Sequence, residues 1–155
     1  MKPKALFFVG IFMVSCLLGC NASPKHPVSN RVQINAGNLN QITGMQWILK
    51  SLKENGQDYP LAGEKPFIKF EPDGKVSGFA SINRYFGSVQ VDSEGKLKWS
   101  PMGSTRMAGS EELMNQEDVF LGILQKTEQL STEGIFLYAY TKDQQAELVF
   151  YVPVK

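Results

Sequence analysis

The sequence predicts an α+β domain in which a mostly antiparallel, barrel-like sheet of about seven or eight strands packs against one main helix. Short runs of alternating apolar and polar residues recur between turn-forming Gly, Pro and Asn residues, a pattern typical of half-buried strands. A single later segment has apolar residues at helical spacing behind an N-cap residue. Strands precede and follow this segment, which is the element order of an α+β domain.

The predicted strands before the helix are separated by turn signals. Trp47 and Leu49 mark the first strand, with Trp47 expected in the core, and Asn55-Gly56 then turns because both residues tolerate positive φ. In Glu71-Pro72-Asp73-Gly74, the proline presets φ and the glycine can adopt a left-handed geometry. The other strands are expected at Phe67–Phe70, Lys75–Ala80, Tyr85–Val91 and Lys96–Ser100.

The main helix is predicted over Ser110–Lys126. Ser110 suits the N-cap, two Glu residues occupy the favourable first turn, and Lys126 lies near the end. The apolar side chains that share one helix face are Leu113, Phe120, Leu121 and Leu124. The pairs Glu111-Glu112 and Glu117-Asp118 are expected on a solvated face. After the helix we expect two or three strands, including the hairpin partners Ile135–Tyr140 and Glu147–Val152.

The first residues have the layout of a secretory signal. Lys2 and Lys4 precede an apolar run that is shorter than the about 20 residues a membrane-spanning helix needs. Its end, Leu17-Leu18-Gly19-Cys20, resembles the lipobox cut by the lipoprotein signal peptidase. We therefore expect residues 1–19 to be a lipoprotein signal peptide and Cys20 to carry lipid. The alternative is an uncleaved anchor with a chance cysteine.

Residues 20–43 are expected to form a flexible tether between the lipidated Cys20 and a domain over residues 44–155. The segment is polar and contains Pro24, Pro27 and five Asn residues, a composition typical of linkers. Val32 and Ile34 alternate with polar neighbours, so a short strand within Arg31–Ala36 is the alternative.

Composition argues against several classes of function. Removal of Lys2 and Lys4 leaves 14 of the 16 basic residues against 15 acidic ones, without a basic run, so no nucleic-acid partner is predicted. With Cys16 removed and Cys20 lipidated, no thiol remains for a disulfide, a metal or catalysis. The single histidine, His26, lies in the expected tether, which argues against a His-based triad or zinc site. We predict no enzyme, no metal and no cofactor.

Several short motifs occur in a recognisable order. Trp47-Ile48-Leu49 comes first, then the run Gly78–Gly87, then Thr105-Arg106-Met107-Ala108 and a helix with Glu117. Their order and spacing resemble the META domain family, whose best-known bacterial members are HslJ-type heat-shock envelope lipoproteins. The resemblance covers roughly residues 44–152. The residues that match the family motifs are Gly78, Asn83, Tyr85, Gly87, Thr105, Met107, Ala108 and Glu117.

The chain departs from the family at two cysteine positions, where Ile82 and Gly109 stand. If these positions lie close together in relatives, the joint replacement avoids a lone thiol. A redox or disulfide role suggested by relatives therefore does not transfer to this chain.

The motif residues have a functional and a structural interpretation. Asn83-Arg84-Tyr85 suits a ligand-contacting loop, but also a strand connection in which Asn bonds nearby backbone, and we favour the connection. Gly78 and Gly87 are expected to permit bulges or close packing.

An anion site is the functional interpretation of Arg106, which precedes the helix N-terminus. We prefer the alternative, in which Thr105 and Ser110 bond backbone groups and Met107 fills core. The aromatic side chains expected on the sheet faces are Tyr138, Tyr140 and Tyr151.

The resemblance implies a non-enzymatic envelope lipoprotein, loosely linked to envelope stress or drug tolerance. Cys20 would hold it in a membrane, and Asn21 in place of the Asp that often retains lipoproteins in the inner membrane favours the outer membrane, facing the periplasm. The alternative is a periplasmic module that inhibits an enzyme, binds an unidentified protein partner or holds a small apolar ligand. A hydrolase is the third and least favoured hypothesis.

Overall fold

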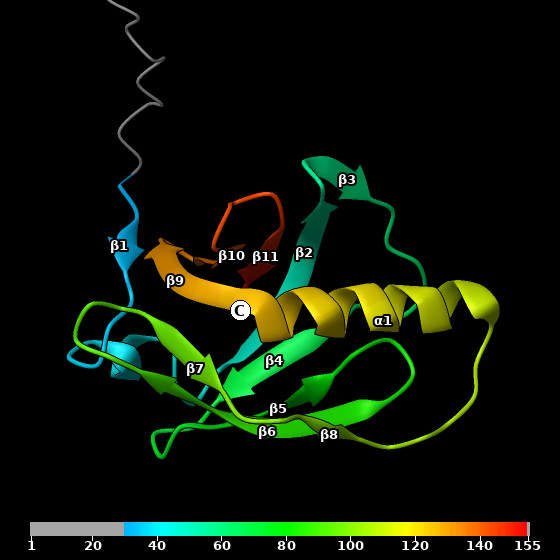
Figure 1. Ribbon diagram of the computed structural model, residues 1–155, viewed down its shortest axis with the longest axis horizontal. Coiled ribbons are helices and arrows are strands. Elements are labelled where there is room, and N and C mark those ends of the chain that lie inside the picture. Colours follow the sequence, from blue (N-terminus) through cyan, green and yellow to red (C-terminus); the bar gives the residue numbers. More distant parts are fainter. Residues whose placement is uncertain (1–29, 155) are drawn as a thin grey trace, which may run out of the picture.

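The computed structural model describes residues 30–154 and shows one α-helix against one large antiparallel sheet (Figure 1). Neighbouring strands follow the order β1-β9-β10-β11-β2-β4-β5-β6-β7, with β3 paired to β2 and β8 paired to β6. The predicted α+β class is confirmed. The sheet has 11 strands and is open, because β7 and β9 approach each other without forming a strand ladder.

The strands before the helix alternate with short turns, as predicted. They are β1 (Val32–Gln33), β2 (Gln46–Glu54), β3 (Gln57–Tyr59), β4 (Phe67–Phe70), β5 (Lys75–Phe79), β6 (Arg84–Val91), β7 (Leu97–Trp99) and β8 (Gly103–Ser104), with the short helix η1 (Leu39–Gln41) between the first two. Three further strands follow α1 (Glu111–Lys126): β9 (Thr127–Glu133), β10 (Phe136–Thr141) and β11 (Glu147–Tyr151).

Turn chemistry places the first hairpins. Asn55 and Gly56 both have positive φ, 52° and 75°, at the predicted turn between β2 and β3. Gly74 has φ 81°, and a Cβ there would lie 2.8 Å from the Val89 carbonyl oxygen, so only glycine fits this turn. Both turn predictions are confirmed.

The helix begins where its capping signal predicts. The Ser110 hydroxyl accepts a hydrogen bond from the Leu113 backbone N–H, and the first helical residue is Glu111. The inner face of α1 buries Phe120, Ile123 and Leu124 against the sheet.

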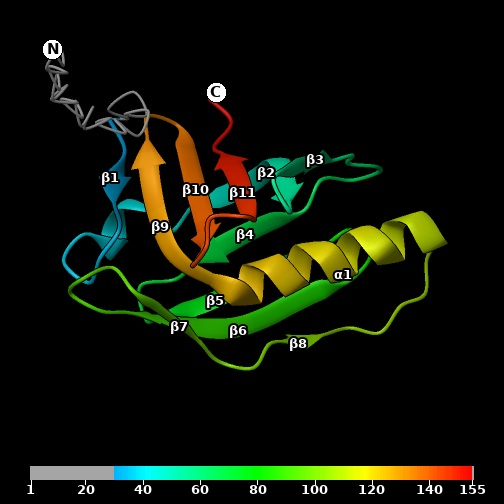
Figure 2. The ribbon, with the colours of Figure 1, turned by 45° about the horizontal axis from the view of Figure 1, so that its top comes forward.

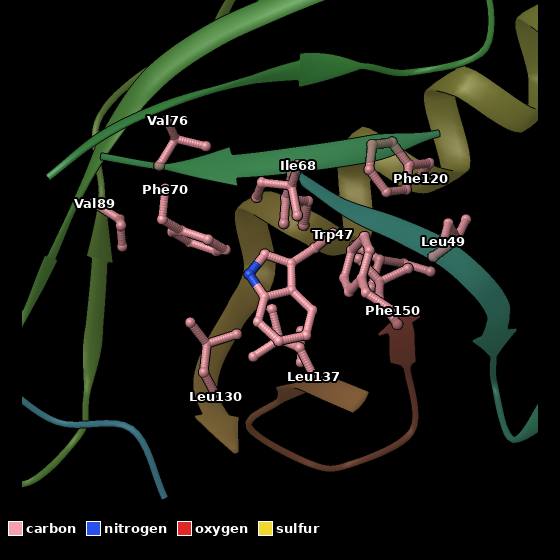
Figure 3. Close-up of a cluster of buried hydrophobic side chains, with 14 of the residues drawn as sticks. Trp47, Leu49, Ile68, Phe70, Val76, Val89, Phe120, Leu130, Leu137 and Phe150 are labelled. Carbon is pink, nitrogen blue, oxygen red and sulfur yellow. The ribbon is translucent and has the colours of Figure 1, made fainter. Parts of the chain in front are cut away.

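The core fills the space between the inner face of the sheet and α1 (Figure 3). Trp47 lies at its centre with 3% of its surface exposed, and its indole N–H donates to the Ile42 carbonyl at 2.9 Å. Leu49 and Leu52 are three residues apart yet both are buried, because the register between β2 and β11 shifts beside Lys50. The predicted core position of Trp47 is confirmed.

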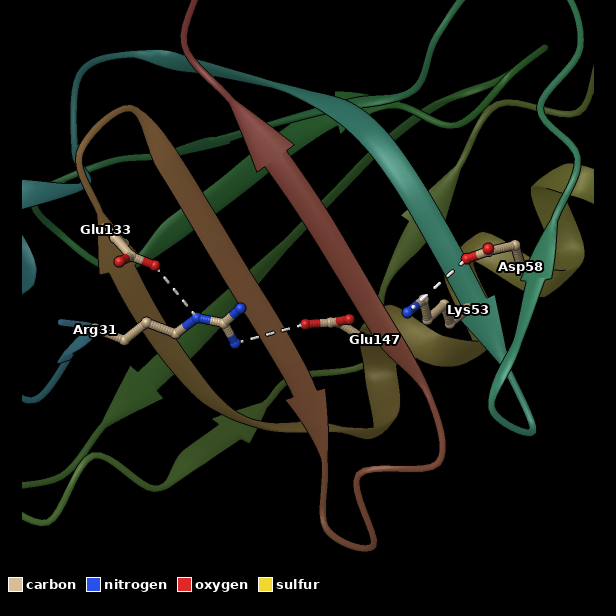
Figure 4. A network of polar contacts seen from close by, with 5 residues as sticks. All are labelled: Arg31, Lys53, Asp58, Glu133 and Glu147. Carbon is tan, nitrogen blue, oxygen red and sulfur yellow. Dashed lines mark ion pairs between the residues drawn. The ribbon is translucent and has the colours of Figure 1, made fainter. Parts of the chain in front are cut away.

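The chain is folded from residue 30 onward, so the predicted tether over residues 20–43 is wrong for its second half. β1 pairs with β9, and Ile34 and Ile42 are fully buried. Arg31 reaches across the sheet to Glu133 and Glu147 (Figure 4). The sequence does not predict these contacts because most residues of the segment are polar and few apolar side chains, Ile34, Leu39 and Ile42, pack in the core. Residues 1–29, which include Cys20 and His26, lie outside the described part of the chain.

β9 is the longest of the strands that the sequence pattern does not predict; β3 and β8 are the short ones. β9 follows α1 without a loop, and its sequence Thr-Glu-Gln-Leu-Ser-Thr-Glu is mostly polar. The strand is nevertheless central to one half of the sheet, between β1 and β10. The indole of Trp99 on β7 donates to the Thr127 carbonyl at 2.9 Å, which bridges the open seam of the sheet.

We expect the substitution Trp47→Ala to lower the free energy of unfolding by about 3–5 kcal/mol, because it empties the centre of the core. Denaturant unfolding followed by circular dichroism measures this change. Trp47→Phe is the control, since it retains an aromatic ring in the core, and it should cost less. A loss below about 1 kcal/mol for the alanine variant would contradict the central position of this side chain.

Candidate functional site

The motif residues gather around the carboxylate of Glu117, which projects from α1 and is 8% exposed. One of its oxygens accepts hydrogen bonds from the backbone N–H groups of Ile82 and Asn83, at 3.1 and 2.8 Å. The other accepts from the Asn83 side-chain amide at 2.8 Å. The carboxylate therefore holds the connection between β5 and β6, residues 80–83, against the helix. The expectation of a solvated Glu117 is wrong.

Asn83 also forms hydrogen bonds with the segment that leads into the helix. Its side-chain oxygen accepts hydrogen bonds from the Met107 backbone N–H and the Thr105 hydroxyl, both at 2.8 Å. Its side-chain nitrogen also donates to the Met107 carbonyl at 3.2 Å. Asn83 is 6% exposed, so one buried amide ties together β6, the 105–107 segment and α1.

Gln116, beside Glu117 on the helix, fixes a second pair of segments. Its amide exchanges two hydrogen bonds with the backbone of Ala62, at 2.7 and 3.1 Å, and donates to the Ser81 hydroxyl at 2.7 Å. Ser81 has φ 128°, a conformation that costs a non-glycine residue about 1–3 kcal/mol and persists where neighbouring contacts enforce it. Gln116 and Glu117 supply those contacts.

Gly78 and Tyr85 form a close pair on β5 and β6. A Cβ on Gly78 would clash with the Phe67 carbonyl oxygen and lie 2.6 Å from the Tyr85 ring. The Tyr85 hydroxyl donates to that same carbonyl at 3.1 Å, and its ring packs edge-on against Phe120. Burial raises the pKa of Tyr85 well above its usual value, which keeps the hydroxyl a donor. A Cβ on Gly87 would lie 3.2 Å from Met102, so this glycine is less tightly enclosed.

The segment before the helix is bonded through its backbone while its side chains face solvent. Met107 is 58% exposed, so the expectation that it fills core is wrong. Ala108 and Arg106 are also exposed, and Arg106 forms no ion pair with the described residues. The Thr105 hydroxyl accepts a hydrogen bond from the Arg84 backbone N–H at 3.2 Å, in line with the structural interpretation.

Ile82 and Gly109, which replace the two family cysteines, are in contact. A Cβ on Gly109 would clash with the end of the Ile82 side chain and lie 2.9 Å from its Cγ1. The isoleucine therefore occupies the space between the two positions, and the half-buried side chain fills it with apolar atoms.

Two shallow hollows lie on the outer face of the sheet beside this network. They have volumes of about 560 and 420 Å³, and Phe67 and Arg84 line both. Phe86, 61% exposed, borders the first, and Met107 borders the second. Both hollows are open to solvent, unlike the enclosed pockets that most small ligands occupy.

The network has the residue content expected of the META domain, and the family model for that domain matches residues 40–152. The chain belongs to the META domain family. The match covers the whole network, from Ala62 to Glu117, and every residue of the buried core except Ile34.

Solved structures support the same fold for this META domain. An NMR structure of a protein from Burkholderia xenovorans aligns with a TM-score of 0.65 and 23% identity, over 85% of this chain and 99% of that one. A crystal structure of a DUF4847 family protein from Bacteroides vulgatus aligns with a TM-score of 0.55 and 12% identity, over 75% and 97% of the two chains. At these identities the likeness is one of fold. No curated protein sequence matches the chain.

Over residues 30–154, no cluster of three His, Cys, Asp or Glu side chains has the arrangement of a metal site. No helix of this part of the chain has the length and hydropathy needed to cross a bilayer.

Neither Gln116 nor Ser81 is predicted from the sequence as a site residue, although one feature of the sequence points to Gln116. Gln116 and Glu117 lie between Leu113 and Phe120, on the face that the apolar residues define. Polar side chains on a buried helix face require partners, so their position predicts a buried network. The positive φ of Ser81 has no counterpart in the sequence.

We expect Glu117→Gln to lower the free energy of unfolding by about 1–3 kcal/mol, because an amide nitrogen replaces one of two oxygens that accept N–H bonds. Asp118→Asn, the exposed neighbour, is the matched control and should change stability by less than about 0.5 kcal/mol. Denaturant unfolding measures both. Equal effects of the two substitutions would show that the Glu117 bonds contribute nothing specific.

The double variant Ile82→Cys, Gly109→Cys is expected to form a disulfide. A Cβ on Gly109 would lie 2.9 Å from Ile82 Cγ1, and Cγ1 is bonded to Ile82 Cβ. The Cβ atoms of residues 82 and 109 are therefore within the roughly 3.5–4.5 Å that a disulfide spans. Oxidation should raise the free energy of unfolding by about 2–4 kcal/mol over the reduced form. Thiol titration measures the bond, and the two single variants should retain a free thiol. Two free thiols in the folded, air-oxidised double variant would contradict the contact.

Proposed function

We propose that this META domain protein is a non-enzymatic lipoprotein of the cell envelope, held in a membrane through lipid on Cys20. The observation that carries the proposal is Leu17-Leu18-Gly19-Cys20, a lipobox-like sequence at the end of a short apolar run. The motif residues extend the likeness to HslJ-type lipoproteins, and with it a role in envelope stress or drug tolerance. Asn21 favours the outer membrane, with the domain facing the periplasm.

The chemistry of the motif residues supports a non-enzymatic role. The Glu117 carboxylate accepts three N–H bonds from the protein itself, and the Asn83 amide is bonded on both of its polar atoms. A general base must instead reach a substrate proton within hydrogen-bond distance. The polar groups that define the family therefore bond one another and stabilise the domain.

A periplasmic binding or inhibitor module is the second candidate. The hollows beside Phe67 and Arg84 favour it, because each places an aromatic ring next to a cation, and the exposed Phe86 borders the first. Their open shape suits a protein segment better than an enclosed small apolar ligand. This candidate is compatible with a lipid anchor, since it concerns what the anchored domain contacts.

Metabolic labelling with a radioactive fatty acid tests the anchor. We expect the wild-type protein to take up label, because Cys20 becomes acylated after cleavage, and the Cys20→Ser variant to take up none. Cys16→Ser is the matched control: it removes the other cysteine, which the cleavage discards, and should leave labelling unchanged.

Equal labelling of the wild type and the Cys20→Ser variant would refute the anchor assignment. So would a wild-type protein that keeps residues 1–19 in the envelope, as judged by its intact mass.

A further inference from the structure

The end of the sheet at which the chain enters the domain carries exposed apolar side chains. Val32, Ile135 and Val154 are 51%, 42% and 78% exposed. They lie near one another because Val32 pairs with Thr132 and the Val152 backbone N–H donates to the Ile135 carbonyl at 3.0 Å. Figure 2 shows the start of β1, the turn between β9 and β10, and the end of β11 at the same end of the molecule. We call this surface the apolar end.

Cationic side chains lie over aromatic rings around the apolar end. Arg31 lies over Tyr138 and Tyr140, at 3.5 and 5.6 Å from the ring centroids. Lys50 lies over Phe136 at 4.4 Å, and Lys65 lies over Tyr151 at 5.9 Å. The nearby acids Glu133 and Glu147 both lie within 4 Å of the Arg31 guanidinium, at 3.7 and 3.8 Å (Figure 4). The two carboxylates outweigh the single charge of Arg31, so the positive charge around the apolar end comes from Lys50 and Lys65, neither of which pairs with an acid of the described chain.

Side chains of these three kinds favour the interface between a lipid bilayer and water. Aromatic rings concentrate at the level of lipid headgroups, where one part of the ring is wet and the other apolar. Lysine is attracted electrostatically to an anionic bilayer surface. Exposed apolar side chains enter the boundary between headgroups and acyl chains. The apolar end and its rim therefore match a membrane surface.

The length of chain beyond the domain brings this surface close to the bilayer. Asn30, the first described residue, is ten positions after Cys20. Ten extended residues span at most about 36 Å, so a lipid on Cys20 keeps the apolar end within that distance. The chain enters the domain at the apolar end itself, so this is the part of the domain nearest to the anchor.

We propose that the apolar end docks on the surface of the membrane that holds Cys20, with Val32, Ile135 and Val154 among the headgroups and Lys50 and Lys65 beside anionic lipid. The inference rests on the proposed lipid anchor. The lipid supplies attachment, and the docked side chains set the orientation of the domain. Docking turns α1, the helix that carries Glu117, away from the bilayer (Figure 2).

Fluorescence quenching in the full lipidated protein tests this orientation. The protein is reconstituted into vesicles of phosphatidylethanolamine and phosphatidylglycerol, with or without a lipid spin-labelled near the headgroup. A bimane label is placed at Ile135→Cys or at Met114→Cys on α1, two positions with matched exposure of 42% and 46%. Because Cys20 is lipidated and Cys16 removed, each new cysteine is the single reactive thiol.

We expect the spin-labelled lipid to quench the label at position 135 about twofold or more, because apolar docking faces lie about 5–10 Å deep, and to leave position 114 nearly unchanged. Adding Val154→Asp to the Ile135→Cys protein should reduce the quenching. Equal quenching at both positions, in protein that floats with the vesicles, overturns the docking and leaves the anchor intact. Protein that does not float with the vesicles overturns the anchor and the docking together.

Discussion

Three N–H groups converge on the Glu117 carboxylate, and the arrangement of several segments depends on this contact. The connection between β5 and β6, the 105–107 segment and α1 share no strand ladder with one another. Glu117 and Asn83 join them through buried polar atoms that all have partners. Removal of one member leaves the others buried without partners, so such networks specify one arrangement rather than several.

The same dependence explains which parts of the fold the sequence predicts. Local signals were sufficient for the Asn55-Gly56 and Gly74 turns and for the Ser110 cap, because each acts within a few residues. The core position of Trp47 followed from strand alternation and side-chain size. Family motifs identified Asn83, Tyr85 and Glu117 before their partners were known. Neither the motifs nor periodicity revealed that these side chains bond one another.

The errors share a physical cause. β9 and residues 30–43 are mostly polar, and they become ordered through pairing with strands that are distant in sequence. The strand propensity of a short stretch of sequence does not reveal such contacts, since strand formation depends on neighbouring strands and on burial. The sequence favours an exposed Glu117 because a carboxylate is rarely buried without partners, and its partners lie 34 and 35 residues away. Residue type favours a buried Met107, although only its backbone is hydrogen-bonded and its side chain is exposed.

The order of strands also has a consequence for the sequence of events in folding. β2 lies between β4 and β11, and β1 pairs with β9. These two N-terminal strands therefore each have a neighbour from the C-terminal part of the chain, which is synthesised last. A chain that emerges N-terminus first cannot complete this sheet until residues 127–151 have followed. Under the export that we propose, this delay would keep the chain extended during passage, because premature folding would block it. The topology thus makes completion of the fold depend on arrival of the C-terminal strands.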